Sequence, residues 1–297
     1  MELFNKSMGK MLLNYLDTNH ILVNVGIFDA ASAAIATKYP QTKGLFISGL
    51  GYTYSQFGWP DVGLINSNEI IHAAKTIRSN HPEIFLTCDI DSGLGGKEQL
   101  RRTCIELRNL GVAAIQLEDQ TLDDKVCGHI PKKVVRPLKE SVERLSLALE
   151  SSYPMQVIAR TDSSTNNDEA LHRVEAFIST GAKIIIVDGI DEKDLIKVIK
   201  FVNKRAHIMA NIVDGGKLLQ HSADYFQQLG ISIMNLSAPL LFKAMHAMNE
   251  RMKNLVGNNW ASSIKNESVM PLGEINEIMT GNYNQFTTHF KKMSHHV

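Results

Sequence analysis

The chain has 297 residues, of which 44% are hydrophobic, and its 31 basic side chains balance 31 acidic ones. This length can form one large α/β domain with a sizeable core, and the balanced charge excludes the basic footprint of a nucleic-acid or membrane-surface binder. The three cysteines, Cys88, Cys104 and Cys127, are too few and too irregularly spaced for a disulfide framework or a zinc site. No secretory leader is recognisable and no apolar run reaches about 18 residues, which predicts a cytoplasmic protein.

Strand and helix patterns alternate along the chain after a predicted N-terminal helix over residues 3–18. Short apolar runs typical of buried strands occur at 22–28, 44–47, 84–88, 112–117, 155–159, 183–187, 207–210 and 231–234. Helical patterns occur at 32–39, 67–79, 97–110, 138–151, 168–180, 192–203, 222–229 and 239–255. A glycine-containing turn is expected over 48–51. Such repeated units indicate a (β/α)₈ barrel, which explains the repetition better than a doubly wound sheet does.

Residues 256–297 depart from this pattern and are expected to form a helical extension, separate from a barrel domain of residues 1–255. A polar link precedes two short predicted helices, 274–280 and 283–292. A tail this short cannot bury its apolar side chains by itself. We therefore expect it to dock on a barrel, either its own or that of a neighbouring subunit.

Polar side chains follow the predicted strands, and in a (β/α)₈ barrel the carboxyl ends of the strands form the active-site face. These residues are Asp29, Ser48, Asp89, Asp91, Glu118, Arg160, Asp188, Asn211 and Ser237. Alternation puts Asp89 and Asp91 on one side of the chain, so they cluster with Glu118 if the third and fourth strands are neighbours. Such oxygen ligands suit Mg²⁺, which keeps several waters. The alternative is that these acids cap helices or pair with arginines.

A long loop, residues 121–136, follows the fourth strand and carries Lys125, Cys127 and His129. It exceeds the roughly two to six residues usual between a strand and a helix, and long loops of this kind are often active-site lids. We expect it to be mobile without ligand and ordered with one. The neighbouring lysine and histidine are expected to ease formation of the Cys127 thiolate.

Seven short motifs occur in order within residues 20–255, each at a predicted strand end or in a loop. They are Ser48-Gly49-Leu50, Gly58-Trp59-Pro60-Asp61, Asp89-x-Asp91-x-Gly93, Glu118-Asp119-Gln120, Lys125-x-Cys127-Gly128-His129, Ala159-Arg160-Thr161-Asp162 and Ala210-Asn211. This series resembles the phosphoenolpyruvate mutase/isocitrate lyase superfamily. The Cys-Gly-His motif, which mutases of the family lack, makes the chain most similar to the branch of 2-methylisocitrate lyase and the petal death protein.

The resemblance implies an enzyme that cleaves the C–C bond beside a 2-hydroxy or 2-oxo acid and leaves an enolate-like carboxylate. That intermediate needs a divalent cation, here Mg²⁺ with Mn²⁺ as a substitute, together with preorganised donors and an acid. It implies Asp89 as the direct metal ligand, with Asp91 and Glu118 holding water ligands. It also implies Cys127 as the proton donor and Arg160 as a group that binds a carboxylate or an oxyanion. The alternative for Arg160 is a purely structural ion pair with Asp162 or Glu118.

Further residues are implied around the small carboxylate substrate. Backbone N–H groups of Ser48, Gly49 and Leu50 would bind a carboxylate, unless they form only a strand-to-helix turn. His129 either orients Cys127, touches substrate or only shapes the loop. The other implied substrate contacts are Asp61, Lys125, Gly128, Asp188, Asn211 and Ser237.

Three departures from the family pattern concern the substrate. Val126 stands where 2-methylisocitrate lyases carry arginine, and Phe46 stands where a tyrosine is expected, with Tyr52 and Tyr54 as substitutes. Asp188-Gly189 replaces a Glu-Ala pair. These changes favour a smaller malate-like acid, oxaloacetate or a phosphonate-pathway acid over 2-methylisocitrate.

Two other function classes remain open, a phosphonomutase-type enzyme that handles a P–C bond and a non-catalytic barrel that binds a ligand or partner. The intact acid cluster, Cys127 and Arg160 argue against the non-catalytic class. The resemblance also implies that subunits exchange the region of their eighth barrel helix and form a homotetramer, a dimer of dimers.

Overall fold

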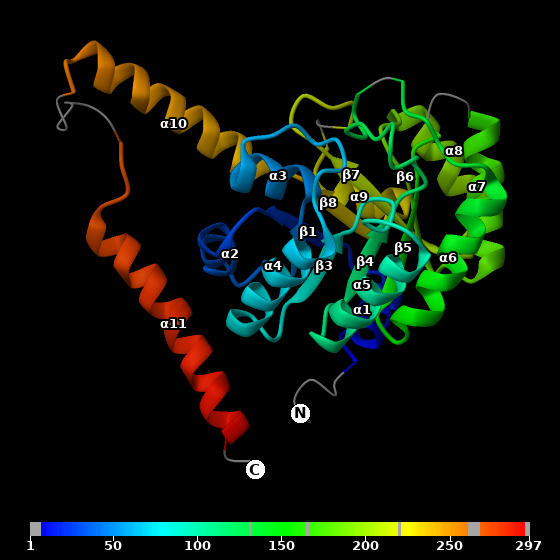
Figure 1. Cartoon of the computed structure of the whole chain (residues 1–297), viewed down its shortest axis with the longest axis horizontal. Coiled ribbons are helices and arrows are strands. Elements are labelled where there is room, and N and C mark those ends of the chain that lie inside the picture. The colour runs from blue at the N-terminus through cyan, green and yellow to red at the C-terminus, as the bar shows by residue number, and fades with distance from the viewer. Residues whose placement is uncertain (1–6, 131, 164–166, 219–220, 261–267, 295–297) are drawn as a thin grey trace.

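Eight parallel strands close into a barrel in sequence order, as the sequence predicts (Figure 1). The computed structural model describes residues 7–130, 132–163, 167–218, 221–260 and 268–294. The strands are β1 Leu22–Ile27, β2 Gly44–Ile47, β3 Phe85–Asp89, β4 Ala114–Leu117, β5 Gln156–Thr161, β6 Ile184–Val187, β7 His207–Ile212 and β8 Ile233–Leu236. The (β/α)₈ prediction is therefore confirmed, including the adjacency of β3 and β4, where Asp89 pairs with Gln116.

Helices flank the barrel, and the eight that follow the pattern expected of the barrel begin within two residues of the predicted positions. The N-terminal helix, predicted over residues 3–18, is described from Met8, and residues 1–6 lie outside the described ranges. The helices are α1 Met8–Asp17, α2 Ala30–Thr37, α3 Gly49–Phe57, α4 Ser67–Asn80, α5 Lys97–Asn109, α6 Leu138–Ser152, α7 Asn167–Thr180, α8 Glu192–Val202, α9 Ala223–Leu229, α10 Pro239–Gly257 and α11 Leu272–Ser294. The Asn66 side chain caps α4, and Glu69 returns a bond to its backbone, as a capping box does. None of the helices in the described ranges is both long and apolar enough to span a lipid bilayer.

Two local predictions are wrong. The expected turn at 48–51 is the start of α3. Ser48 caps this helix, because its hydroxyl accepts a hydrogen bond from the N–H of Gly51 at 3.2 Å. The glycines concealed this helix because they weaken its pattern. The two short helices expected at 274–280 and 283–292 form the single helix α11, because Gly281 costs a helix only about 1 kcal/mol and does not break it.

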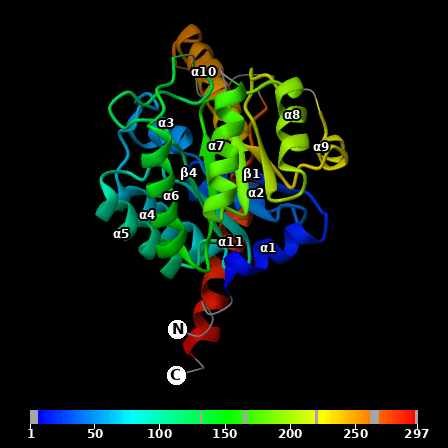
Figure 2. The ribbon, with the colours of Figure 1, turned by 90° about the vertical axis from the view of Figure 1, so that its right-hand side faces the viewer.

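Helix α1 closes the amino-terminal end of the barrel (Figure 2). Its buried side chains Met8, Leu12 and Leu16 pack with barrel residues that include Leu22 and Ile233. Burying these side chains contributes about 1.5–3 kcal/mol each. The sealed end leaves the carboxyl ends of the strands as the face open to a ligand.

The last two helices lie largely apart from the barrel (Figure 1). In α10 only Leu241 is buried, and a stripe of apolar side chains is exposed, namely Met245, Met248, Met252 and Val256. Helix α11 contacts α2 and α4, and Lys38 pairs with Glu274 at 3.1 Å. A cavity of about 700 Å³ lies between α11 and the amino-terminal end of the barrel, near the start of β3. The extension is therefore loosely packed on its own barrel.

Candidate active site

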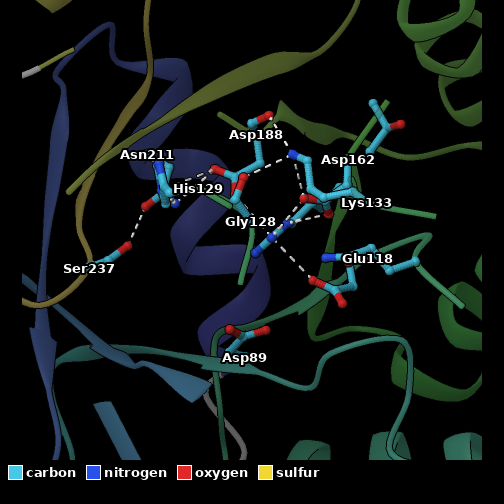
Figure 3. Close-up of polar contacts among 12 residues, drawn as sticks. Asp89, Glu118, Gly128, His129, Lys133, Asp162, Asp188, Asn211 and Ser237 are labelled. Atoms are coloured by element: carbon cyan, nitrogen blue, oxygen red, sulfur yellow. Dashed lines mark hydrogen bonds and ion pairs between the residues drawn. The ribbon is translucent and has the colours of Figure 1, made fainter. Parts of the chain in front are cut away.

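The predicted site residues converge at the carboxyl ends of the strands, beneath the loop that follows β4 (Figure 3). A small cavity there is lined by Phe46, Ser48, Leu50, Asp61, Asp89, Gln116, Cys127, Gly128, His129, Arg160, Asp188, Asn211, Val213, Ser237 and Ala238. Four predicted residues, Gly49, Asp91, Glu118 and Lys125, lie behind this lining and contact it. The N–H of Gly49 donates to Asp89 Oδ2 at 3.4 Å, so it supports the cluster of acids rather than a substrate carboxylate.

Asp89, Asp91 and Glu118 form the cluster of acids that the strand ends predict. The N–H of Asp91 donates to Asp89 Oδ1 at 3.2 Å, and the N–H of Glu118 donates to the backbone oxygen of Asp91 at 2.9 Å. Asp91 adopts a left-handed backbone (φ 46°) that turns the chain back toward β4. Asp91 and Glu118 are buried, whereas Asp89 keeps an edge open to the cavity. The three acids are thus held by backbone geometry.

This cluster carries more negative charge than its surroundings neutralise. Burial, and then the charge of Asp91, raises the pKa of Asp89 to about 7. Burial also raises the pKa of Asp91 and brings that of Glu118 well above its usual range. The Glu118 carboxylate has ion-pair contacts with Arg160 and Lys125, but neither of its oxygens has a hydrogen bond within the described residues. Buried acids with raised pKa values and oxygens without hydrogen bonds fit a site for an additional cation.

Lys125 belongs to the acid cluster and not to the thiol. Its Nζ atom lies 3.0 Å from Asp61, 3.1 Å from Asp91 and 3.9 Å from Glu118. Burial opposes its charge, but these carboxylates outweigh burial and raise the pKa of Lys125 well above its usual range. The expectation that Lys125 eases formation of the Cys127 thiolate is therefore wrong, because its ammonium is committed elsewhere.

Cys127 is half-buried at the roof of the cavity. Burial raises the pKa of its thiol to about 11, although the backbone N–H of His129 hydrogen-bonds the sulfur and lowers the pKa in part. The side chain therefore carries its proton near neutral pH. A proton-bearing thiol suits an acid that protonates carbon and does not suit a nucleophile.

Arg160 forms both of its alternative ion pairs and a third. Its guanidinium bonds Asp162 at 2.8 and 3.0 Å, and its Nη2 atom lies 3.2 Å from Glu118 and 2.9 Å from Asp188. Burial opposes the charge, but the carboxylates raise the pKa of Arg160 well above its usual range. The guanidinium is therefore permanently charged and held rigidly at the cavity wall.

His129 is held by an amide network on the opposite wall. Asn211 Nδ2 donates to Asp188 Oδ1 at 2.8 Å and lies 3.2 Å from His129 Nε2. The Ser237 hydroxyl donates to Asn211 Oδ1, as does Asn235 at 3.0 Å, which fixes the amide with its nitrogen toward His129. Since that nitrogen only donates, Nε2 accepts. Burial lowers the pKa of His129, so the imidazole is neutral.

Asp188 joins the two walls. Burial opposes its ionisation, but the charges of Arg160 and Lys133 and the hydrogen bond from Asn211 outweigh burial and lower its pKa to about 2. Its carboxylate is therefore ionised at any physiological pH. It holds Arg160 on one side and Asn211 on the other.

Sequence reasoning missed residues that anchor the loop. The Gln120 side chain bonds both the N–H of Val126 at 3.2 Å and its carbonyl at 3.0 Å. The Lys133 ammonium reaches Gly128, Asp162 and Asp188. Gln120 stood in a motif and so gave a signal, whereas Lys133 is one lysine in a polar loop and gave none. Of the two tyrosines expected to replace the missing hydroxyl, Tyr54 lies near Cys127 and Asp61, while Tyr52 packs against Phe57 and lines a separate pocket.

A cluster of buried acids beneath a loop with a Cys-Gly-His motif, at the carboxyl end of a (β/α)₈ barrel, defines an enzyme of the phosphoenolpyruvate mutase/isocitrate lyase superfamily. The family model described as phosphoenolpyruvate phosphomutase matches residues 12–256, and the chain belongs to this family.

Known relatives include lyases and a hydrolase of small carboxylates. The 2-methylisocitrate lyase of Bacillus subtilis is 33% identical over 75% of this chain and 73% of its own. The 2,3-dimethylmalate lyase of Eubacterium barkeri is 28% identical over 89% of this chain and 91% of its own. A solved structure of oxaloacetate acetylhydrolase with the inhibitor 3,3-difluorooxalacetate superimposes with a TM-score of 0.84, at 25% identity over 97% of both chains. The activity of this enzyme is therefore of the superfamily's kind, that of a lyase, hydrolase or mutase acting on small carboxylates.

Proposed function

We propose that the protein is a Mg²⁺-dependent carbon–carbon lyase or hydrolase of the cytoplasm that acts on a short 2-hydroxy or 2-oxo diacid. The observation that carries the proposal is the placement of Asp89 and Arg160 in one cavity beneath the proton-bearing thiol of Cys127. Bond cleavage beside a carboxylate needs an anion-stabilising centre and a carbon acid on opposite sides of the reacting atoms.

Asp89 is the residue proposed to ligate Mg²⁺ directly, because its edge faces the cavity. Within the described chain, no three His, Cys, Asp or Glu side chains are arranged to hold a metal by themselves. That suits an ion that keeps most of its waters, which Asp91 and Glu118 would hold. When bound, the cation supplies positive charge for the oxygen of an enolate-like intermediate.

The chain's own residues carry the other steps. Arg160, fixed by its carboxylate partners, binds a substrate carboxylate or the developing oxyanion. Glu118, whose pKa burial raises, in its ionised form accepts through an intervening water the proton of a 2-hydroxyl group, or of the hydrate that a 2-oxo acid forms by adding one water before its C–C bond breaks. Cys127 gives its proton to the carbon that leaves, and the neutral His129 holds the sulfur through its backbone N–H. The closed loop excludes water from the carbanion-like centre.

The cavity favours a small acid. Among the described residues that line it, Arg160 is the only lysine or arginine, since Lys125 is engaged by the acids behind. Phe46 is fully buried and brings no hydroxyl, and Val126 brings no charge to the loop. One fixed cation together with a bound metal suits two carboxylates better than three. We therefore favour oxaloacetate or a malate-like diacid, such as 2,3-dimethylmalate, over 2-methylisocitrate.

A phosphonomutase is the second candidate, because the matching family model is described as a phosphomutase. A substrate screen separates the candidates. Enzyme with Mg²⁺ is incubated with oxaloacetate, 2,3-dimethylmalate, 2-methylisocitrate and phosphonopyruvate, and pyruvate, oxalate and phosphorus products are followed by NMR. We expect cleavage of oxaloacetate or 2,3-dimethylmalate. A rearranged P–C bond favours the mutase, and ligand binding without any product contradicts an enzyme of either kind.

The loop 121–136 is expected to open so that substrate can enter. Ligand that fills the cavity should hold it closed through Cys127, Gly128 and His129, which line that cavity. Saturating oxalate should therefore slow proteolytic cleavage within this loop several-fold, as measured by mass spectrometry of the fragments. Cleavage at sites in the tail after residue 257 is the internal control. Equal cleavage of the loop with and without oxalate would contradict the lid assignment.

We further propose a homotetramer in which α10 and the extension, residues 256–297, pack on a neighbouring subunit. The exposed apolar stripe of α10 and the cavity beneath α11 support this proposal. Removal of residues 256–297 should reduce oligomer size and unfolding temperature together, as measured by light scattering and calorimetry. Met248→Glu should weaken assembly, whereas Asn249→Glu, which adds the same charge to the neighbouring exposed position, should not. A monomeric full-length chain, or an unchanged truncated tetramer, would refute the arrangement.

A further inference from the structure

We propose that Lys133 is a positioning residue that holds the Cys127-Gly128-His129 segment over the cavity. The inference rests on the proposed function in one respect, because it takes Cys127 as the proton donor. The contacts that carry it do not depend on which substrate is cleaved.

One ammonium group joins the loop to two strands (Figure 3). Lys133 Nζ donates to the Gly128 carbonyl at 2.9 Å, to Asp162 Oδ1 at 3.0 Å and to the Asp188 carbonyl at 3.2 Å. The first acceptor lies in the loop, the second follows β5 and the third follows β6. The side chain is 5% exposed. All three donors of the ammonium are therefore used: one bond holds the Gly128 peptide within the loop, and the other two tie the loop to the ends of β5 and β6.

At Gly128 the loop packs directly against the side chains of Asp188 and Arg160. A Cβ atom at this position would overlap Asp188 Oδ2 and Arg160 Nη2, so only glycine fits. Its carbonyl then points to Lys133, and Cys127 precedes it directly. The position of the Cys127 sulfur thus follows from where the Gly128 peptide is held.

The same ammonium also supports the arginine clamp. Asp162 Oδ1 accepts from Lys133 and, at 3.0 Å, from Arg160 Nη2, and Asp162 Oδ2 accepts from Arg160 Nε at 2.8 Å. Asp162 therefore sits between two cations, with a side chain that is fully buried. Loss of the lysine would release the Gly128 peptide from the ends of β5 and β6 and leave Asp162 with one partner fewer. Lys133 thereby couples loop closure to the placement of Arg160.

The reactivity of Cys127 toward iodoacetamide tests this role, because Cys88 and Cys104 are buried and only Cys127 is partly accessible. Lys133→Met keeps the length of the side chain and removes the ammonium. Lys132→Met is the matched control, because Lys132 is the adjacent residue and is exposed. The labelling rate of each cysteine is measured by peptide mass spectrometry at fixed pH, with the unfolding temperature as a check on folding.

We expect Lys133→Met to raise the Cys127 labelling rate at least about tenfold, the scale of one lost charge-assisted hydrogen bond. Cys88 and Cys104 should stay unlabelled, Lys132→Met should behave as wild type, and Lys133→Arg should recover most of the slow rate. An unchanged rate in Lys133→Met overturns the proposal. Labelling of all three cysteines also overturns it, because the lysine would then support the whole barrel.

Turnover supplies a second readout. With a substrate that the wild-type enzyme accepts, Lys133→Met should lower kcat more than it raises KM, because the thiol is misplaced while Arg160, which keeps its own pairs with Glu118, Asp162 and Asp188, still binds the acid. If labelling rises but no substrate is ever cleaved, the proposed function fails and the positioning role stands. If turnover exists and labelling does not change, the positioning role fails alone.

Discussion

Asp89→Asn and chelation by EDTA are each expected to lower turnover at least about 10³-fold, because several kcal/mol of charge stabilisation would be lost from the enolate-like state. Mg²⁺ or Mn²⁺ added back should restore chelated wild type but not the variant. Steady-state kinetics with the substrate found in the screen measure both effects. Asp123→Asn, a change at an exposed acid of the loop 121–136, is the control and should leave turnover unchanged.

The stability of Asp89→Asn distinguishes a functional acid from a structural one. Burial and Asp91 raise the pKa of Asp89 to about 7, so its charge is unfavourable in the metal-free fold. The metal-free variant should therefore unfold at the same temperature as wild type or higher, as measured by calorimetry in EDTA. Full activity of chelated enzyme, or a large loss of stability in the variant, would contradict a metal-binding role.

Cys127→Ser is expected to cut turnover at least about 10²-fold, the usual scale for a lost general acid, and to leave oxalate binding intact. A hydroxyl has the same shape but is a far weaker acid than a thiol. Cys104→Ala, at a buried cysteine outside the cavity, should keep turnover near that of wild type. Equal turnover of Cys127→Ser and wild type would remove Cys127 from the mechanism.

The pH profile follows from the same thiol. Burial raises the pKa of Cys127 to about 11, and the form that carries the proton is the active one. The activity that depends on it should therefore stay level from neutral to mildly alkaline pH and decline only as pH approaches about 11. A decline centred near pH 8 would mean that burial does not raise the pKa of the Cys127 thiol when the loop is closed on substrate.

The amino-acid sequence by itself determined the barrel, because strand and helix periodicities are local properties of the chain. The apolar run 112–117 is typical of a buried strand, and polar residues at the strand ends mark the active-site face in any such barrel. Asp89, Asp91 and Glu118 could be grouped because β3 and β4 are consecutive. The sequence misjudged α3 and α11, where glycines blur the helical period.

Only the tertiary structure decided where the charged side chains of the loop point. Lys125 and Lys133 are both lysines of one polar loop, yet Lys125 enters the acid cluster and Lys133 binds the ends of β5 and β6. Likewise, Cys127 follows Lys125 by two residues, but the ammonium of Lys125 binds the acid cluster, and burial raises the pKa of the thiol. A long side chain reaches several ångströms from its backbone, so its partner is chosen by which strand ends the closed barrel brings within that reach, and this depends on residues far apart in the chain.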